Sequence, residues 1–127
     1  MPSRKVVQDF VDLVEANRVV EAMESFLAED ASTRENNAAP TVGREVIIAN
    51  ERRLLERVSI VAKPGSVYLV DGDLVVINWI FEIAYPDGTG YAFEELEIQR
   101  WREDKIAEAR FFYDPGQRKP PLDAKPR

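Results

Sequence analysis

Apolar residues in the first third of the chain recur at helical spacing. Val7, Phe10, Val11 and Val14 stand at positions i, i+3, i+4 and i+7, which places them on one face of an amphipathic helix. Residues 15–17 indicate a short break. The apolar stripe that follows predicts a second helix, packed against the first as a hairpin. This second stripe comprises Val19, Val20, Met23, Phe26 and Leu27.

The next segment changes from helix to strand and back to helix. Residues 29–37 lose the helical period and end in turn-forming residues, which predicts one short strand. Pro40 and Gly43 then precede a third helix. The apolar side predicted for this helix comprises Val46, Ile47, Ile48, Leu54, Leu55 and Val58.

The second half of the chain has the pattern of strands joined by tight turns. Residues 59–70 contain a Pro-Gly step, which is typical of an edge strand or a bulged strand. Asp-Gly steps in residues 71–73 and 86–89 predict turns on either side of a strand at 74–85. That strand is apolar on both faces, so its second face needs cover from a pocket or a dimer partner. The last two strands are predicted at 91–102 and 106–113. Helices followed by an antiparallel meander indicate an α+β fold.

Composition limits the chemistry. The 127 residues include 23 acidic residues and carry a net charge of −6, so we expect no nucleic-acid or membrane partner. The chain has no apolar run of membrane-spanning or signal-peptide type, which favours a cytoplasmic location. It contains no His and no Cys, so catalysis would depend on Asp, Glu, Tyr, Lys or Arg, and we expect no metal and no cofactor.

Four segments carry a family resemblance. Residues 26–31 (FLAEDA), 40–45 (PTVGRE), 99–101 (QRW) and 111–115 (FFYDP) resemble, in order and spacing, the nuclear transport factor 2-like superfamily, in its SnoaL-like and ketosteroid-isomerase-like branch. The resemblance implies a cone: three N-terminal helices packed on a curved, largely antiparallel sheet that encloses one pocket. It implies a SnoaL-like domain at residues 1–116, with 117–127 as a Pro-rich charged tail. The fold hosts isomerases, cyclases, hydrolases and binding modules, so it does not define an activity.

The resemblance also implies site residues. The carboxylate base of ketosteroid isomerases falls on Glu35, and their protonated, oxyanion-stabilising acid falls on Glu97. Their Tyr on the first helix falls on Val11, beside Phe10, and neither side chain donates a hydrogen bond. Half of the oxyanion hole is therefore missing, which argues against steroid isomerase activity.

Two other branches give partial matches. SnoaL-like cyclases place an acid/base carboxylate on the closing strand, where Asp114 is the nearest residue, but their partner His is absent here. The Asp-Arg-Asp relay of limonene epoxide hydrolases has no clear counterpart, although Arg100 and Arg110 are available.

The inward face of strand 91–102 has two interpretations. Glu95, Glu97 and Trp101 share one face, because side chains alternate along a strand. That face lines the pocket if the isomerase alignment holds. In the alternative, Leu96 and Ile98 form the core and the glutamates face water; Glu35 could likewise be a solvated acid. The candidate ligand-contacting residues are Trp79, Phe81, Glu95, Trp101 and Tyr113.

The sequence therefore predicts a SnoaL-like protein that binds a small apolar, carbonyl-bearing molecule. It could act as an isomerase, cyclase or hydrolase through the carboxyl groups of Glu35, Glu97 and Asp114. The alternative is a non-catalytic ligand-binding or dimerisation module. We also expect a homodimer, and expect Glu35→Gln and Glu97→Gln to hold or raise the melting temperature, since a buried carboxylate loses hydration.

Overall fold

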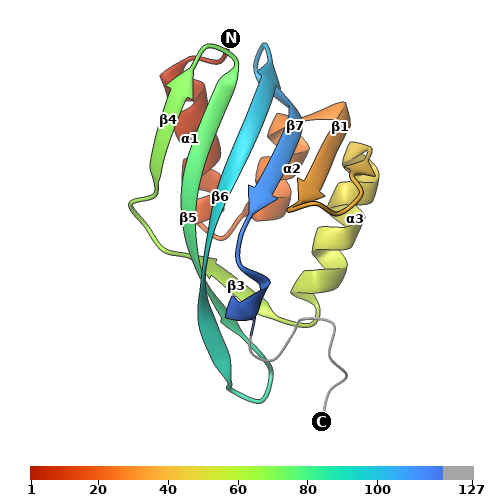
Figure 1. Cartoon of the computed structure of the whole chain (residues 1–127), viewed down its shortest axis with the longest axis vertical. Helices are drawn as coiled ribbons and strands as arrows, with labels where there is room; N and C mark the ends of the chain where they lie inside the picture. Colours follow the sequence, from red (N-terminus) through yellow and green to blue (C-terminus); the bar gives the residue numbers. More distant parts are fainter. Residues whose placement is uncertain (119–127) are drawn as a thin grey trace.

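The computed structural model describes residues 1–118 as three helices packed on one curved sheet of seven strands (Figure 1). The helices are α1 (Arg4–Glu15), α2 (Val19–Phe26) and α3 (Arg44–Leu55). The strands are β1 (Leu27–Glu35), β2 (Thr41–Val42), β3 (Ser59–Ala62), β4 (Val67–Asp71), β5 (Leu74–Ala84), β6 (Gly90–Arg102) and β7 (Lys105–Phe112), followed by the 3₁₀ turn η1 (Pro115–Gln117). The predicted α+β class is confirmed. The part of the predicted tail beyond residue 118 lies outside the described residues.

The first helix forms as predicted. All four residues of its apolar stripe are buried, and Ser3 caps its N-terminus by accepting a hydrogen bond from the Val6 amide. The second helix is one residue shorter than predicted. Leu27 has extended backbone and is the first residue of β1, which pairs in parallel with β7. The strand predicted at 29–37 therefore begins two residues earlier, because its pairing with β7 starts at Leu27.

The third helix presents a different face from the one predicted. Ile47 and Ile48 are buried, whereas Val46 is half-exposed, because it lies off the stripe that faces the sheet. Val58 is buried but lies beyond the helix, in a small second core with Ile83 and Phe93. The prediction was wrong for both Val46 and Val58.

The Pro-Gly step divides the edge strand in two. β3 pairs with residues 81–84 of β5, and β4 pairs with residues 74–78 of the same strand. Gly65, at the break, has a φ of 84°, which favours glycine. The prediction of an interrupted edge strand is confirmed.

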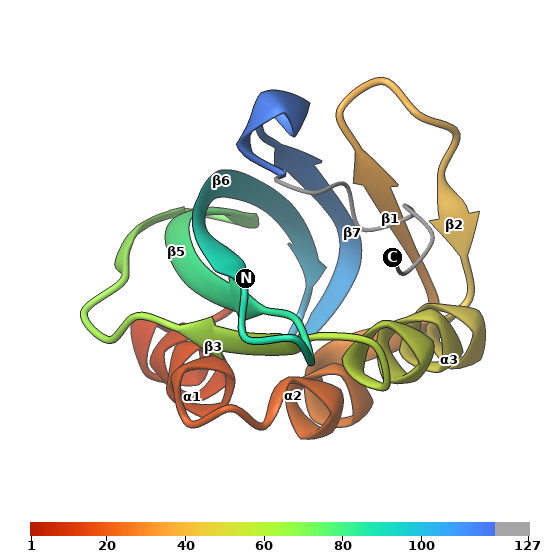
Figure 2. The same cartoon turned by 90° about the horizontal axis from the view of Figure 1, so that it is seen from below.

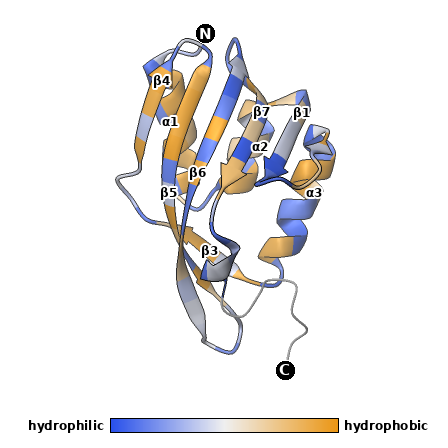
Figure 3. Cartoon of the chain, viewed as in Figure 1, coloured by the Kyte–Doolittle hydropathy of each residue, from blue (hydrophilic) through white to orange (hydrophobic). Residues whose placement is uncertain are grey.

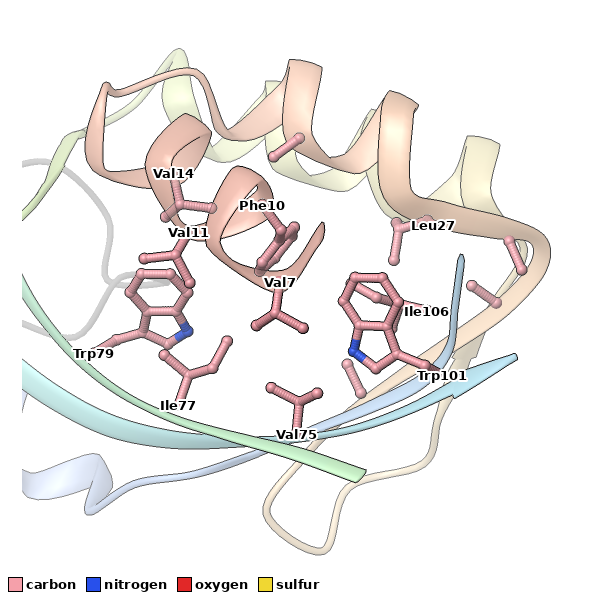
Figure 4. Close-up of a cluster of buried hydrophobic side chains, with 14 of the residues drawn as sticks. Val7, Phe10, Val11, Val14, Leu27, Val75, Ile77, Trp79, Trp101 and Ile106 are labelled. Carbon is pink, nitrogen blue, oxygen red and sulfur yellow. The ribbon is translucent and has the colours of Figure 1, made fainter. Parts of the chain in front are cut away.

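The sheet curls around the helices. Its strand order is β2-β1-β7-β6-β5-β3, with β4 also on β5, and all pairs except β1–β7 are antiparallel. Figure 2 shows the concave side of the sheet facing α1, α2 and α3. The main core fills the space between α1 and the inward residues Val75, Ile77 and Trp79 of β5 (Figure 4).

The outward side of the sheet carries an apolar patch. Leu69 of β4 and Ile98 of β6 both stand opposite Val76 of β5, and Val67 and Leu96 stand opposite Asn78 in the next row. Leu69 is 69% exposed. Figure 3 shows hydrophobic colouring along β4 and β5. We call Val67, Leu69, Leu96 and Ile98 the outer patch.

Candidate functional site

A cavity of about 380 Å³ opens between the helices and the concave face of the sheet. Its wall is mostly apolar, with Phe10 and Met23 from α1 and α2 and Trp79 and Phe81 from β5. Five ionisable residues also line it: Glu35, Glu51, Glu95, Glu97 and Arg118. The cavity therefore combines an apolar interior with several carboxyl groups.

The inward face of β6 is the one that carries the glutamates. The Glu97 residue is only 5% exposed, whereas Leu96 is 45% and Ile98 is 39% exposed on the opposite face. The β5–β6 pairing runs without a bulge and sets Trp79 opposite Glu95. The pocket-facing interpretation of the strand is thus confirmed, and the interpretation with Leu96 and Ile98 in the core is wrong.

Buried polar groups form a continuous hydrogen-bonded chain across the concave face. The indole Nε1 of Trp79 donates to Glu97 Oε1 at 2.8 Å, and Gln99 Nε2 donates to Glu97 Oε2 at 2.9 Å. Trp101 Nε1 in turn donates to Gln99 Oε1 at 2.8 Å. Both ends of the chain are indoles, which only donate, so the Glu97 side chain must accept at both of its oxygens.

This hydrogen-bonded chain of side chains is compatible with a neutral Glu97 carboxyl group. Burial raises the pKa of the Glu97 carboxyl, and the hydrogen bonds from Gln99 and Trp79 oppose this shift. A protonated carboxyl keeps both bonds, since its hydroxyl oxygen accepts one hydrogen bond while its own proton points elsewhere. Glu97 also lines the cavity, so its carboxyl group borders the space that a ligand would fill.

Glu95 is the carboxyl most strongly affected by its surroundings. Burial in the cavity wall, followed by the nearby charges of Glu97 and Glu35, raises its pKa to about 8. The Arg118 guanidinium acts in the opposite direction. Glu95 is therefore a proton donor or acceptor that changes state near neutral pH.

Glu35 lies at the mouth of the cavity, at the end of β1. The strand is held there by its pairing with Phe111 of β7 and by a turn at Asn36, where φ is 48°. Asn36 Oδ1 accepts from the Tyr113 amide at 3.0 Å, and Arg110 Nε donates to the Asn36 carbonyl at 3.0 Å. The Glu35 side chain is exposed and lies 3.6 Å from Arg118. Its backbone is thus fixed while its carboxylate stays in contact with water.

Three of the candidate residues do not line the cavity. Trp101 is buried in the core between Phe10 and Phe26, with ring centroids 6.3 and 6.0 Å away, beyond an irregularity in the β6–β7 pairing. Tyr113 lies outside the lining, where its hydroxyl accepts from Arg118 at 2.9 Å. Asp114 is exposed and accepts from the Gly116 amide at 2.9 Å, as the cap of η1. The structure does not bring Asp114 together with Glu35 and Glu97.

Two ionisable lining residues were missed by the sequence analysis. Glu51 stands four residues after Ile47 and four before Leu55, so helical spacing alone places it on the inner face of α3. Burial, followed by the charge of Glu35, raises its pKa. Arg118 lies in a segment without periodicity, and no pattern in the sequence indicated that it would reach the cavity.

Neither a metal cluster nor a phenol donor is present in the described part of the site. Among residues 1–118, no group of three or more acidic side chains could hold a metal ion. None of the described lining residues is a tyrosine, and Phe10 of α1 forms part of the wall.

Among residues 1–118, no helix is long and apolar enough to span a membrane.

Comparison with known proteins establishes the family. The model of the SnoaL-like domain matches residues 7–109, so the chain belongs to the SnoaL-like family of the nuclear transport factor 2-like superfamily. No protein of curated function matches the sequence.

Solved structures share the fold at low sequence identity. A provisionally named polyketide cyclase from Xanthomonas campestris pv. campestris has a TM-score of 0.79 and 18% identity over 94% of this chain and 95% of its own. A provisionally named SnoaL-like polyketide cyclase from Mesorhizobium loti has a TM-score of 0.73 and 21% identity over 86% and 97%. An LEH-like epoxide hydrolase from M. tuberculosis has a TM-score of 0.74 and 16% identity over 93% and 86%. At these identities the likeness shows the fold alone.

Proposed function

We propose that this SnoaL-like protein binds a small apolar, carbonyl-bearing molecule in the cone and acts on it by carboxyl acid–base chemistry. The observation that carries the proposal is the placement of Glu95 and Glu97 side by side in an apolar cavity, with pKa values raised by burial. A carboxyl kept neutral in this way donates a hydrogen bond to a carbonyl oxygen, where negative charge develops when an adjacent carbon loses a proton.

Two carboxyl groups of the cavity suit two different roles. Glu35, exposed at the mouth, would remove the proton from the carbon next to the carbonyl. The electrons of that C–H bond form a carbon–carbon double bond, and the carbonyl π electrons move to oxygen, where Glu97 donates its hydrogen bond. Return of the proton to carbon completes an isomerisation or exchange.

The alternative is a ligand-binding module without catalysis. The observation that favours it is that the position of the isomerase tyrosine falls on Val11, and none of the described lining residues is a tyrosine. Binding of a carbonyl compound would then occur without proton transfer.

Deuterium exchange distinguishes these functions. We expect the protein to accelerate exchange of the protons next to the carbonyl of butyrophenone in D₂O, followed by proton NMR against buffer alone. Glu35→Gln should slow this exchange about a hundredfold or more, since a general base typically contributes about 10²–10⁴. Glu82→Gln, an exposed change on the outer side of β5, is the matched control. Binding of butyrophenone without any exchange would support the non-catalytic module.

We also propose that the outer patch is a homodimer interface. It presents two neighbouring rows across β4, β5 and β6, Leu69–Val76–Ile98 and Val67–Asn78–Leu96, on the side of the sheet away from the helices. A dimer of standard size buries about 1,600 Å² in total, and we expect that or somewhat less.

Charge in the outer patch should separate the dimer. Leu69→Lys combined with Ile98→Lys is expected to give a monomer in sedimentation equilibrium at micromolar concentration, with an unchanged circular dichroism spectrum. Val42→Lys with Val46→Lys adds the same charge at exposed sites elsewhere and should leave the dimer intact. A wild-type protein that sediments as a monomer contradicts the proposal.

A further inference from the structure

The segment after β7 folds back onto the sheet and places an arginine at the cavity. β7 makes its last pair with β6 at Leu96, so the backbone of Glu94 is left without a strand partner on that side. The Gln117 side chain takes this place: the Glu94 amide donates to Gln117 Oε1 at 2.9 Å, and Gln117 Nε2 donates to the Glu94 carbonyl at 2.9 Å. Arg118 follows directly and lines the cavity.

The Arg118 guanidinium lies beside two aromatic rings, and one of its nitrogens makes a hydrogen bond to another of the residues 1–118. It lies over the Tyr113 ring at 4.9 Å and over the Phe93 ring at 5.7 Å. One of its terminal nitrogens donates to the Tyr113 hydroxyl and lies 3.6 Å from a Glu35 oxygen, beyond a normal hydrogen bond. Its Nε is buried and has no hydrogen-bond partner among the described residues.

This arrangement fits an anion. A guanidinium carries five N–H donors in a planar fork that matches a carboxylate in two parallel hydrogen bonds. Contact with two neighbouring rings limits the movement of the fork, and a buried donor without a partner is unfavourable until an acceptor arrives. Of the four cavity carboxyls, Glu51, Glu95 and Glu97 have raised pKa values, so they favour the neutral form and repel an entering anion less.

We propose that Arg118 forms an anion subsite at the cavity mouth, which binds the carboxylate of an otherwise apolar ligand in place of Glu35. The inference rests on the proposed function and narrows its substrate class to apolar keto acids. The apolar body fills the cavity, the ketone reaches the neutral carboxyl groups of β6, and the carboxylate pairs with Arg118. Release of Glu35 from Arg118 by the ligand frees the carboxylate that serves as base.

Three matched probes test the subsite at pH 6, where Glu95 is neutral: benzoylpropionate, its methyl ester, and butyrophenone. We expect calorimetric titration to show wild type binding benzoylpropionate at least tenfold tighter than the ester. Arg118→Met should reduce this preference to within twofold and leave ester binding unchanged, while Arg118→Lys, which keeps the charge without the fork, should be intermediate. Arg57→Met removes an exposed charge away from the cavity and should keep the full preference.

Each outcome has a separate meaning. Equal binding of the acid and the ester by wild type, or a preference that survives in Arg118→Met, overturns the subsite and leaves the proposed function standing. Binding of the acid alone, lost in Arg118→Met, supports the subsite, and the deuterium-exchange assay then decides the carbonyl function. If none of the probes binds, both are overturned. Unfolding curves of each variant report whether the loss of the contact with the two rings has altered the fold.

Discussion

Glu97→Gln is expected to lower the free energy of unfolding by about 1–3 kcal/mol, the cost of a buried donor left without an acceptor. The amide introduced at position 97 would have one accepting oxygen where Glu97 has two. If that oxygen faces Trp79, the new NH₂ faces the NH₂ of Gln99; turning Gln99 around sets its NH₂ against the Trp101 indole. Every arrangement leaves one N–H group facing another. Urea unfolding monitored by tryptophan fluorescence measures the loss.

Exchanging Glu97 and Gln99 should restore the hydrogen-bonded chain. When Glu97→Gln is combined with Gln99→Glu, Trp79 donates to the oxygen of the new amide, and the NH₂ of that amide donates to the new carboxyl group on the neighbouring side chain. The new carboxyl group also accepts from Trp101. All donors are satisfied, so the double variant should recover at least half of the stability lost by Glu97→Gln.

The exchange also moves the carboxyl group away from the ligand. Gln99 does not line the cavity, so a carboxyl group placed there cannot donate to a bound carbonyl. The double variant should therefore fold normally and fail to catalyse deuterium exchange, as measured by the same proton NMR assay with butyrophenone.

A different pattern would contradict this account. If Glu97→Gln is as stable as wild type, or if the exchanged pair is no more stable than Glu97→Gln alone, the hydrogen-bond chain does not govern the energetics. The first result would instead agree with the sequence-based expectation, in which loss of hydration dominates the cost of a buried carboxyl.

The stability of the protein is expected to fall as the pH rises from about 4.5 to about 8. The folded-state pKa of Glu95 is about 8, above its ordinary value of 4.5, so the folded chain holds a proton that the unfolded chain has released in this range. The stabilisation that Glu95 contributes is fully present below its pKa in the unfolded chain, and it is lost as the pH rises towards its pKa in the folded protein. The slope from this single group is at most about 1.4 kcal/mol per pH unit, and Glu51 and Glu97 add to it in the same direction.

Glu95→Gln should flatten this profile. The amide does not ionise, so the variant should be more stable than wild type at pH 8 and nearly equal to it at pH 4.5, as measured by urea unfolding at a series of pH values. Glu82→Gln, exposed on the outer side of β5, should reproduce the wild-type profile. A Glu95→Gln profile parallel to that of wild type would mean that the Glu95 carboxyl titrates as it does in water.

The local elements were largely determined by the sequence. Helix α1 follows from the spacing of Val7, Phe10, Val11 and Val14, because a 3.6-residue period buries one stripe whatever packs against it. The break in the edge strand follows from Pro64, which lacks an amide donor, and Gly65, which permits a positive φ. The family resemblance placed Glu35 and Glu97 at positions that the structure brings into one cavity.

The tertiary structure alone decided which side of each element faces inward and which distant groups meet. Alternation along β6 separates Glu97 from Leu96 and Ile98, but only the curvature of the sheet over the helices makes the glutamate side concave and buried. Trp101 shares that side, yet it packs in the core rather than the cavity wall. Arg118 reaches the site because Gln117 bonds to the backbone of β6, and such a long-range contact leaves no period in the sequence. Periodicity reports the face of an element, whereas the contacts that shift pKa values and satisfy donors depend on how the elements pack together.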